Sequence, residues 1–284
     1  MKYNKISNDS CSVRWVIALK EEAETILVHY KMKLISNKTP YPIFKNNEET
    51  HWLVLSGIGR HNSAAATSYL YSISKASKWT SWINIGIAGC RKGNYGDLCL
   101  VDKIVNNSSQ ITYPKSIPKT NLHRMELLTT DVPITDYSNE ELIDMEGSAF
   151  YDIASKLTTR ELICIMKVIS DGPSNHINDL NKLKIHQLIK SNISQINKVV
   201  LYFEKLSLHE DKIRKKPELF HDICSKWHFS TTQMHQLENL TRRLIIFSDK
   251  NDIMELIKGC KSSSSVITFL KSKINSNQIN WSKF

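Results

Sequence analysis

Residues 51–74 read HWLVLSGIGRHNSAAATSYLYSIS, and this stretch decides the fold class. It opens with a short apolar run that ends in serine and glycine, which is typical of a β-strand stopping at a turn. An alanine-rich segment of helical composition follows at once. A strand that leads directly into a helix is the unit from which α/β domains with parallel sheets are built.

The same unit recurs on both sides of this stretch. Upstream, SVRWVIAL (12–19) predicts a strand, and KEEAETILVHYKMKL (20–34) predicts a helix because its apolar residues fall at helical spacing. Downstream, ELICIMKVIS (161–170) is a continuous apolar run of the kind expected for a strand covered on both faces. Further apolar runs predict strands within 79–90, 96–105 and 125–134. We therefore predict an α/β fold with a central, mostly parallel mixed sheet between helical layers.

The chain changes character towards its C-terminus. A long helical pattern from Asn181 to Leu208 closes the α/β domain, and the charged EDKIRKKPE segment follows. Four short helices are predicted after it, with Ser230 and Asp252 as N-caps. We predict two domains, residues 1–208 and a basic, all-helical extension, residues 209–284. Residues 205–284 hold 14 lysines and arginines against 8 acidic residues.

Composition limits the classes of protein to consider. Of the 284 residues 41% are apolar and 23% are charged, which indicates a folded globular chain. No apolar run reaches the roughly 18 residues that a membrane helix needs, and the N-terminus lacks the apolar stretch of a secretory signal, so we expect a cytoplasmic protein without membrane contact. The six cysteines form no CxxC pair, as expected for reduced thiols. The net charge of +10 alone decides little.

Candidate site residues follow the predicted strands, because ligands of open α/β sheets bind beyond the carboxyl ends of the strands. Glu22 follows the first strand, the SGIG stretch at 56–59 follows the second, and the GIAG stretch at 86–89 lies at the end of the third. Ser170 and Asp171 follow the strand at 161–169. Each also has an ordinary explanation, such as a solvated helix carboxylate for Glu22 or a turn former for Asp171.

A further candidate lies in LIDMEGSAFYDIASK, residues 142–156, where Asp144 and Glu146 interrupt an apolar run. Apolar residues recur every four positions from Met145 and predict a helix that packs along one face. Acidic residues favour the first turn of a helix, where exposed amides and the helix dipole stabilise the charge. We therefore expect Glu146 to be ionised.

Seven motifs in this order resemble the purine nucleoside phosphorylase and nucleosidase superfamily, particularly the methylthioadenosine/S-adenosylhomocysteine nucleosidases. They are ALKEEA, LSGIGRHNSAAAT, INIGIAG, GDLCLVD, TTDVPI, IDMEGSAF and MKVISDGP, and they cover about residues 13–205. The resemblance implies a three-layer α/β/α phosphorylase-like core. It also implies an enzyme that cleaves the N-ribosidic bond of a purine nucleoside or related thionucleoside, with no cofactor and no metal, as a homo-oligomer with a dimer favoured.

The resemblance also implies roles for individual residues. Asp171 would be the general acid that donates a proton towards N7 of the base, and Glu22 would orient or deprotonate the attacking water. Glu146 would accept hydrogen bonds from the ribose hydroxyls while Met145 packs on the sugar. The remaining substrate-binding residues would be Ser56, Gly57, Gly86, Ile87, Ala88, Gly89, Ile134 and Ser170.

The nucleophile divides this superfamily. Phosphorylases place arginines after the first strand and before the glycines of the third, whereas this chain has Glu22 and Asn84 there. A carboxylate would repel phosphate, so water is favoured, although Lys20 and Arg60 leave phosphorolysis open.

The chain is also shorter between Asp97 and Glu146 than nucleosidases are. It has Pro133 where adenosine-cleaving members have a stacking phenylalanine.

The C-terminal extension leaves a second class of function open. His221, His228 and His235 are spaced by seven residues, or roughly 10 Å along a helix, which is too far apart for one metal ion. Residues 218–244 could form a helix-turn-helix with Arg242 and Arg243 available for phosphates, although a small helical bundle packed on the enzyme or on another subunit is the simpler interpretation. A non-catalytic nucleoside- or nucleic-acid-binding protein therefore remains an alternative.

Overall fold

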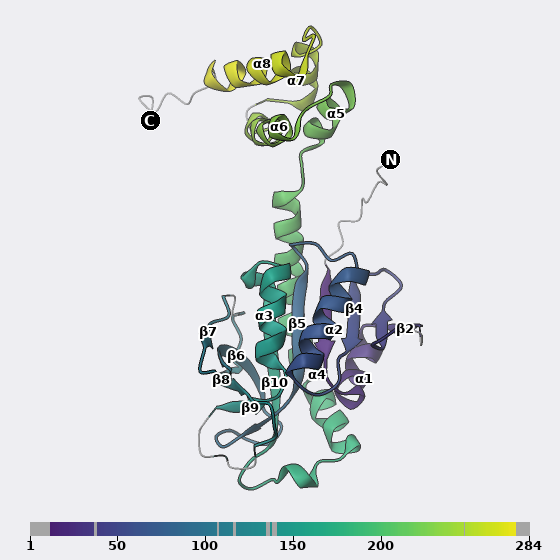
Figure 1. Cartoon of the computed structure of the whole chain (residues 1–284), viewed down its shortest axis with the longest axis vertical. Helices are drawn as coiled ribbons and strands as arrows, with labels where there is room; N and C mark the ends of the chain where they lie inside the picture. The colour runs from purple at the N-terminus through teal and green to yellow at the C-terminus, as the bar shows by residue number, and fades with distance from the viewer. Residues whose placement is uncertain are drawn as a thin grey trace. The chain divides into compact units, whose positions relative to one another are not determined.

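The computed structural model describes residues 12–36, 39–106, 108–115, 118–134, 137, 141–246 and 248–276. The chain forms two compact units, Met1–Lys212 and Ile213–Phe284. The first unit has a central sheet with helices on both faces (Figure 1). The predicted α/β/α fold class, with a helical C-terminal module, is therefore confirmed.

The first unit contains ten strands and four α-helices in its described residues. The strands are β1 (Val13–Ile17), β2 (Lys33–Ser36), β3 (Ile43–Lys45), β4 (His51–Leu55), β5 (Ser81–Cys90), β6 (Leu98–Val105), β7 (Ile111–Thr112), β8 (His123–Thr129), β9 (Leu142–Asp144) and β10 (Ile163–Asp171). The helices are α1 (Lys20–His29), α2 (Arg60–Ile73), α3 (Gly147–Leu157) and α4 (Lys182–Arg214).

The middle of the sheet is parallel, in the order β4, β1, β5 and β10. At one side the sheet curls back on itself, because β5 pairs with β10 and also, through Gly89 and Cys90, with β9. The path β10-β6-β8-β9-β5 therefore closes into a ring of strands. This closure places β9 beside the C-terminal end of β5, which in turn pairs with β10.

Both faces of the central strands are apolar, which is why they appear as continuous apolar runs. In β1, Trp15 and Ile17 pack towards α1 and α4, whereas Val16 packs towards α2 and α3. The same alternation holds in β10, where Met166 faces one side and Ile165 the other. In Figure 1, α2 and α3 lie in front of the sheet and α4 passes behind it.

Three predicted boundaries are wrong. The first helix ends at His29, and residues 33–36 form the edge strand β2 instead of continuing the helix to residue 34. The helix predicted to end at Leu208 continues to Arg214, through residues assigned to a charged linker. The N-cap of the helix Lys250–Leu256 is Asp249, so the cap is not Asp252.

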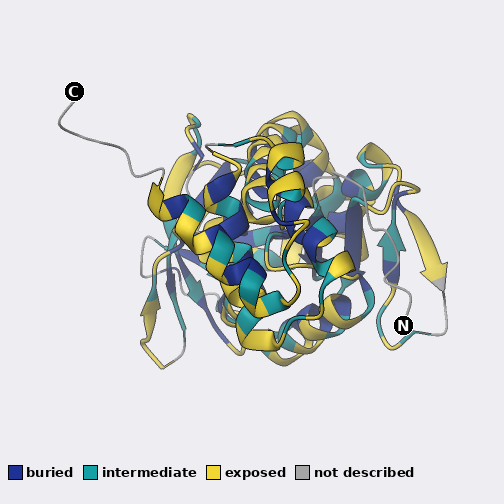
Figure 2. Cartoon of the chain, turned by 90° about the horizontal axis from the view of Figure 1, so that it is seen from above, coloured by how far each residue is buried: buried dark blue, intermediate teal, exposed yellow. Residues whose placement is uncertain are grey.

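The second unit is a small helical bundle. Its helices are α5 (Glu218–Lys226), α6 (Thr231–Leu244), α7 (Lys250–Leu256) and α8 (Ser263–Ser276). Its core is built from leucines and isoleucines of all four helices, with Phe220 and Val266. Figure 2 shows buried and exposed residues alternating along such helices, as expected for amphipathic segments. Ser230 accepts a hydrogen bond from the N–H of Gln233, which confirms it as an N-cap.

Arg242 has an internal role in this unit. Its guanidinium donates to the carbonyls of Ile213 and Arg214 and pairs with Glu238 at 3.0 Å. Arg242, offered by the helix-turn-helix alternative as a phosphate contact, is thus engaged within the unit. In the described part of the chain no helix is long and apolar enough to cross a membrane, and no group of three or more potential ligands could hold a metal ion.

Candidate active site

A cavity of about 280 Å³ lies at the C-terminal ends of β1, β5, β9 and β10. Nine of the predicted site residues line it together: Glu22, Ile87, Ala88, Gly89, Ile134, Met145, Glu146, Ser170 and Asp171. Ser56, Gly57 and Gly86 do not line it. A larger hollow of about 540 Å³ is bordered by β6 and β8, but it contains none of the predicted site residues. We take the smaller cavity as the site because buried carboxylates converge on it.

Glu22 is almost fully buried although it lies in the first turn of α1. Its two carboxylate oxygens accept the N–H groups of Ile87 and Leu19, each at 2.9 Å. Burial raises the pKa of Glu22 to about 7. These hydrogen bonds and the nearby positive charge of Lys167 lower the pKa, but burial outweighs them. Gly86 makes this position possible, since a Cβ there would lie 2.8 Å from Glu22 Oε1. Glu22 is thus not a solvated helix carboxylate.

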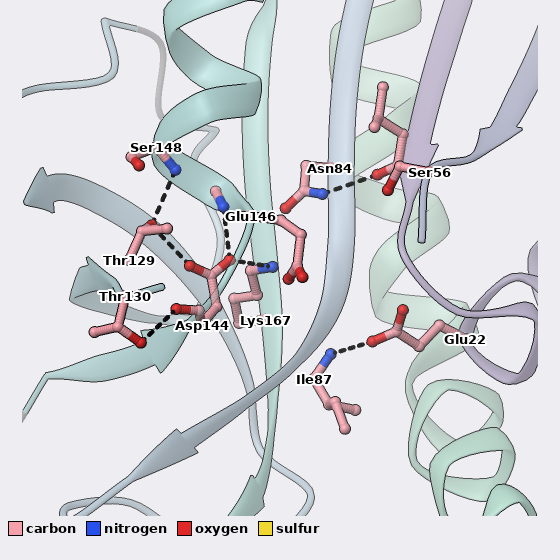
Figure 3. A network of polar contacts seen from close by, with 12 residues as sticks. Glu22, Ser56, Asn84, Ile87, Thr129, Thr130, Asp144, Glu146, Ser148 and Lys167 are labelled. Carbon is pink, nitrogen blue, oxygen red and sulfur yellow. Dashed lines mark hydrogen bonds and ion pairs between the residues drawn. The ribbon is translucent and has the colours of Figure 1, made fainter. Parts of the chain in front are cut away.

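Lys167 is a buried functional candidate that the sequence analysis missed. It extends from β10, opposite Gly86 of β5, and its ammonium lies 2.7 Å from Asp144 Oδ2 (Figure 3). Burial alone would lower the pKa of Lys167, but the surrounding carboxylates outweigh burial, so the pKa is raised. A lone lysine within the apolar run ICIMKVIS was the available signal, because a buried lysine needs an acidic partner.

Asp144 anchors this network at the end of β9. Its Oδ1 accepts the hydroxyl of Thr129 at 2.7 Å, and its Oδ2 accepts the N–H of Gly147 at 2.8 Å. Figure 3 shows these bonds together with the ion pair to Lys167. Asp144, rather than Glu146, therefore pairs with the N–H of Gly147 at the start of α3, where amides lack a partner within the helix.

Glu146 occupies the N-cap position of α3, but its side chain leaves the helix and accepts the N–H of Gly59 at 2.7 Å. Burial and the nearby Asp144 carboxylate raise the pKa of Glu146. Lys167 and the backbone N–H groups of Gly59 and Met145 act in the opposite direction and lower the pKa of Glu146. The side chain joins the loop before α2 to the start of α3, and Met145 lies beside it in the cavity wall.

Asp171 ends β10 with its carboxylate buried against Gly89. The hydroxyl of Ser170 donates to Oδ1, and the hydroxyl of Tyr137 donates to Oδ2. A Cβ on Gly89 would lie 2.6 Å from Asp171 Oδ2, so only glycine fits there. Tyr137 was not predicted, because a single tyrosine in the polar segment before β9 carries no signal of a long-range contact.

Lys20 and Arg60, the two cationic residues that left phosphorolysis as an alternative, do not line the cavity. Lys20 is exposed, and Arg60 forms a bidentate ion pair with Asp131 at 2.6 and 2.9 Å. None of the described residues that line the cavity is a lysine or an arginine. Pro133 does line it, at the position discussed for base stacking.

No family model and no curated protein sequence matches the chain. Solved structures match its fold. The apo 5′-methylthioadenosine nucleosidase of Arabidopsis thaliana aligns with a TM-score of 0.57 and 18% identity, over 68% of this chain and 96% of that chain. The 5′-methylthioadenosine/S-adenosylhomocysteine nucleosidase of Helicobacter pylori, with butyl-thio-DADMe-Immucillin-A, gives 0.52 and 14%, over 66% and 99%.

The same nucleosidase from Neisseria meningitidis, in complex with methylthio-immucillin-A, gives a TM-score of 0.52 and 15% identity, over 71% of this chain and 99% of that chain. At these identities the likeness shows a shared fold. The family resemblance predicted from the sequence motifs is thus confirmed at the level of the fold.

Proposed function

We propose that the chain is an N-ribosyl hydrolase that cleaves a purine nucleoside or related thionucleoside into free base and sugar. The observation that carries the proposal is the convergence of Glu22, Glu146 and Asp171 on one small cavity. Breaking an N-ribosidic bond needs an acid for the base, a hold on the ribose and an activated nucleophile. Three carboxylates from three different elements supply one group for each task. The shared nucleosidase fold supports the same assignment.

Glu22 is suited to activate water. With a pKa of about 7 it is partly ionised near neutral pH and remains a strong enough base to take a proton. The attacking water adds its oxygen to C1′ and gives its proton to Glu22. The electron pair of the C1′–N9 bond passes into the purine, which takes a proton at N7 from Asp171. Nucleoside and water thus become base and ribose, and both side chains regain their protonation states by exchange with solvent.

Water rather than phosphate fits the charge of the site. Glu22, Asp144 and Glu146 surround the single ammonium of Lys167, and that ammonium is already paired with Asp144. A phosphate dianion would meet an excess of negative charge, and no cation among the described residues that line the cavity. Water carries no such penalty.

The test is an incubation with a panel of adenine, guanine and modified nucleosides, with and without phosphate, while free base is measured. We expect release in the absence of phosphate. Asp171→Asn is expected to lose about 100-fold or more, because a general acid contributes that much. Release that requires phosphate would replace hydrolysis by phosphorolysis, and no release with any nucleoside would favour a binding protein.

We also propose a homo-oligomer, with a dimer favoured. Large apolar side chains are exposed on the first unit, among them Val132 (65%), Tyr113 (59%) and Ile111 (52%). Light scattering on the full chain tests this, since a monomeric mass at micromolar concentration would exclude it.

A further inference from the structure

Tyr137 contacts Asp171, the proposed general acid, and the mechanism above gives this tyrosine no role. Its side chain is 8% exposed, and its hydroxyl donates to Oδ2 of Asp171. Ser170 donates to the other oxygen, Oδ1. The carboxylate is therefore held by one hydroxyl at each oxygen.

Gly89 makes this arrangement possible. A Cβ at Gly89 would lie 2.6 Å from Asp171 Oδ2 and 2.8 Å from Cε1 of Tyr137. The edge of the phenol ring and the carboxylate oxygen thus share the space above one glycine of β5. Gly89 and Asp171 both line the cavity, whereas Tyr137 does not. The phenol therefore reaches the carboxylate from beside the cavity and leaves the cavity itself open to a base.

We propose that Tyr137 is a positioning residue for Asp171, which fixes the carboxylate against Gly89 and donates a hydrogen bond to it as the base leaves. This inference rests on the proposed function. A hydrogen-bond donor stabilises a carboxylate more than a protonated carboxyl. Tyr137 therefore favours proton transfer from Asp171 to N7 as the C1′–N9 bond breaks. Its own phenol has a raised pKa, through burial and the Asp171 contact, so it stays protonated and remains a donor.

Other titratable groups near Asp171 belong to the two hollows that it borders. Glu22, Asp144 and Glu146 line the cavity with it. Cys90, Arg91 and Tyr95 line a smaller hollow on its other side. A Tyr137→Phe variant leaves all of them in place, so a change in the pH profile between the two proteins reports the lost hydroxyl.

The experiment compares pH profiles of kcat/KM for wild type and Tyr137→Phe on two substrates. One is the purine nucleoside that wild type cleaves fastest, and the other is 4-nitrophenyl β-D-ribofuranoside, whose leaving group departs without a proton. In Tyr137→Phe, the carboxylate that forms on Asp171 as the base leaves loses one hydrogen bond. We expect kcat/KM for the nucleoside to fall, because a hydrogen bond to a charged group contributes to its stability.

At the pH optimum this fall should be about threefold to tenfold, because only part of the charge on Asp171 has developed in the transition state. Cleavage of the nitrophenyl riboside should change by less than about twofold. Tyr30→Phe is the matched control, because it removes a phenol that donates to Asn197 at 2.8 Å outside the cavity wall. It should leave both profiles unchanged.

Two results would overturn the inference. One is an unchanged kcat/KM for the nucleoside in Tyr137→Phe. The other is an equal loss on both substrates, which indicates a structural role for the tyrosine. These are distinguishable from failure of the proposed function, because in that case wild type itself would release no base from any nucleoside.

Discussion

Replacement of Glu22 by glutamine should make the stability of the protein less dependent on pH. The pKa of this buried carboxyl is raised from 4.5 to about 7 in the folded chain. Between these values the folded state binds a proton that the unfolded state has lost, so stability falls as pH rises through this window. From this shift the cost of ionising Glu22 is about 1 kcal/mol at pH 5 and about 3 kcal/mol at pH 8. The Glu22→Gln variant does not incur this cost.

Urea unfolding of wild type and Glu22→Gln at pH 5 and pH 8 measures the difference. We expect the free energy of unfolding of the variant, relative to wild type, to rise by about 2 kcal/mol from pH 5 to pH 8. A constant offset between the two proteins is also expected, because glutamine offers only one oxygen to the N–H groups of Ile87 and Leu19. The contribution of the C-terminal unit is the same in both proteins and cancels.

Glu21→Gln is the matched control for this experiment. Glu21 precedes Glu22 in the same helical turn, but it is partly exposed and a hydrogen bond with its own backbone lowers its pKa. A lowered carboxyl pKa stabilises the fold at every pH above the unfolded value, so this variant should show no change between pH 5 and pH 8. If Glu22→Gln also shows a constant offset, Glu22 does not carry the raised pKa on which its role as base depends.

Three further variants test the network around the cavity. Lys167→Met should lower the free energy of unfolding by about 3 to 5 kcal/mol, because the carboxylate of Asp144 is left buried and unpaired, and denaturant unfolding measures this. Gly89→Ala should lower the free energy of unfolding by about 1 to 3 kcal/mol through crowding. It should also reduce base release at least about tenfold by displacing Asp171, and full activity would contradict the close packing. Arg60→Ala should change stability by less than about 1 kcal/mol and leave base release independent of phosphate, so a loss specific to phosphate-containing buffer would show that Arg60 binds phosphate.

The central strands can be predicted from the sequence because burial on both faces determines their amino-acid composition. In β10 and β5 both faces are covered by helices, so every position favours an apolar residue and the run is continuous. The edge strand β2 gives no such signal. Its residues continue the apolar spacing of α1, and the turn at Lys31 has a φ of 53° without the glycine that would mark it.

The carboxylates of the site could be predicted because each follows a strand or begins a helix, where ligand-binding groups collect. Their environment could not be predicted. Whether Glu22 is solvated or buried depends on the missing Cβ of Gly86 and on Lys167, which are distant in sequence. The three-residue strand β9 closes the ring of strands through pairing with β5 and β8, and this long-range pairing brings Asp144 to Lys167.

The identity of the sugar product tests the central claim most directly. Wild-type protein is incubated with a nucleoside that it cleaves, in buffer containing millimolar phosphate, and the sugar is identified by proton and phosphorus NMR during turnover. Hydrolysis activated by Glu22 predicts free ribose, or the free thioribose derivative, even with phosphate present. A sugar 1-phosphate as the product would contradict the account, because phosphate would then enter a cavity that the structure lines with carboxylates.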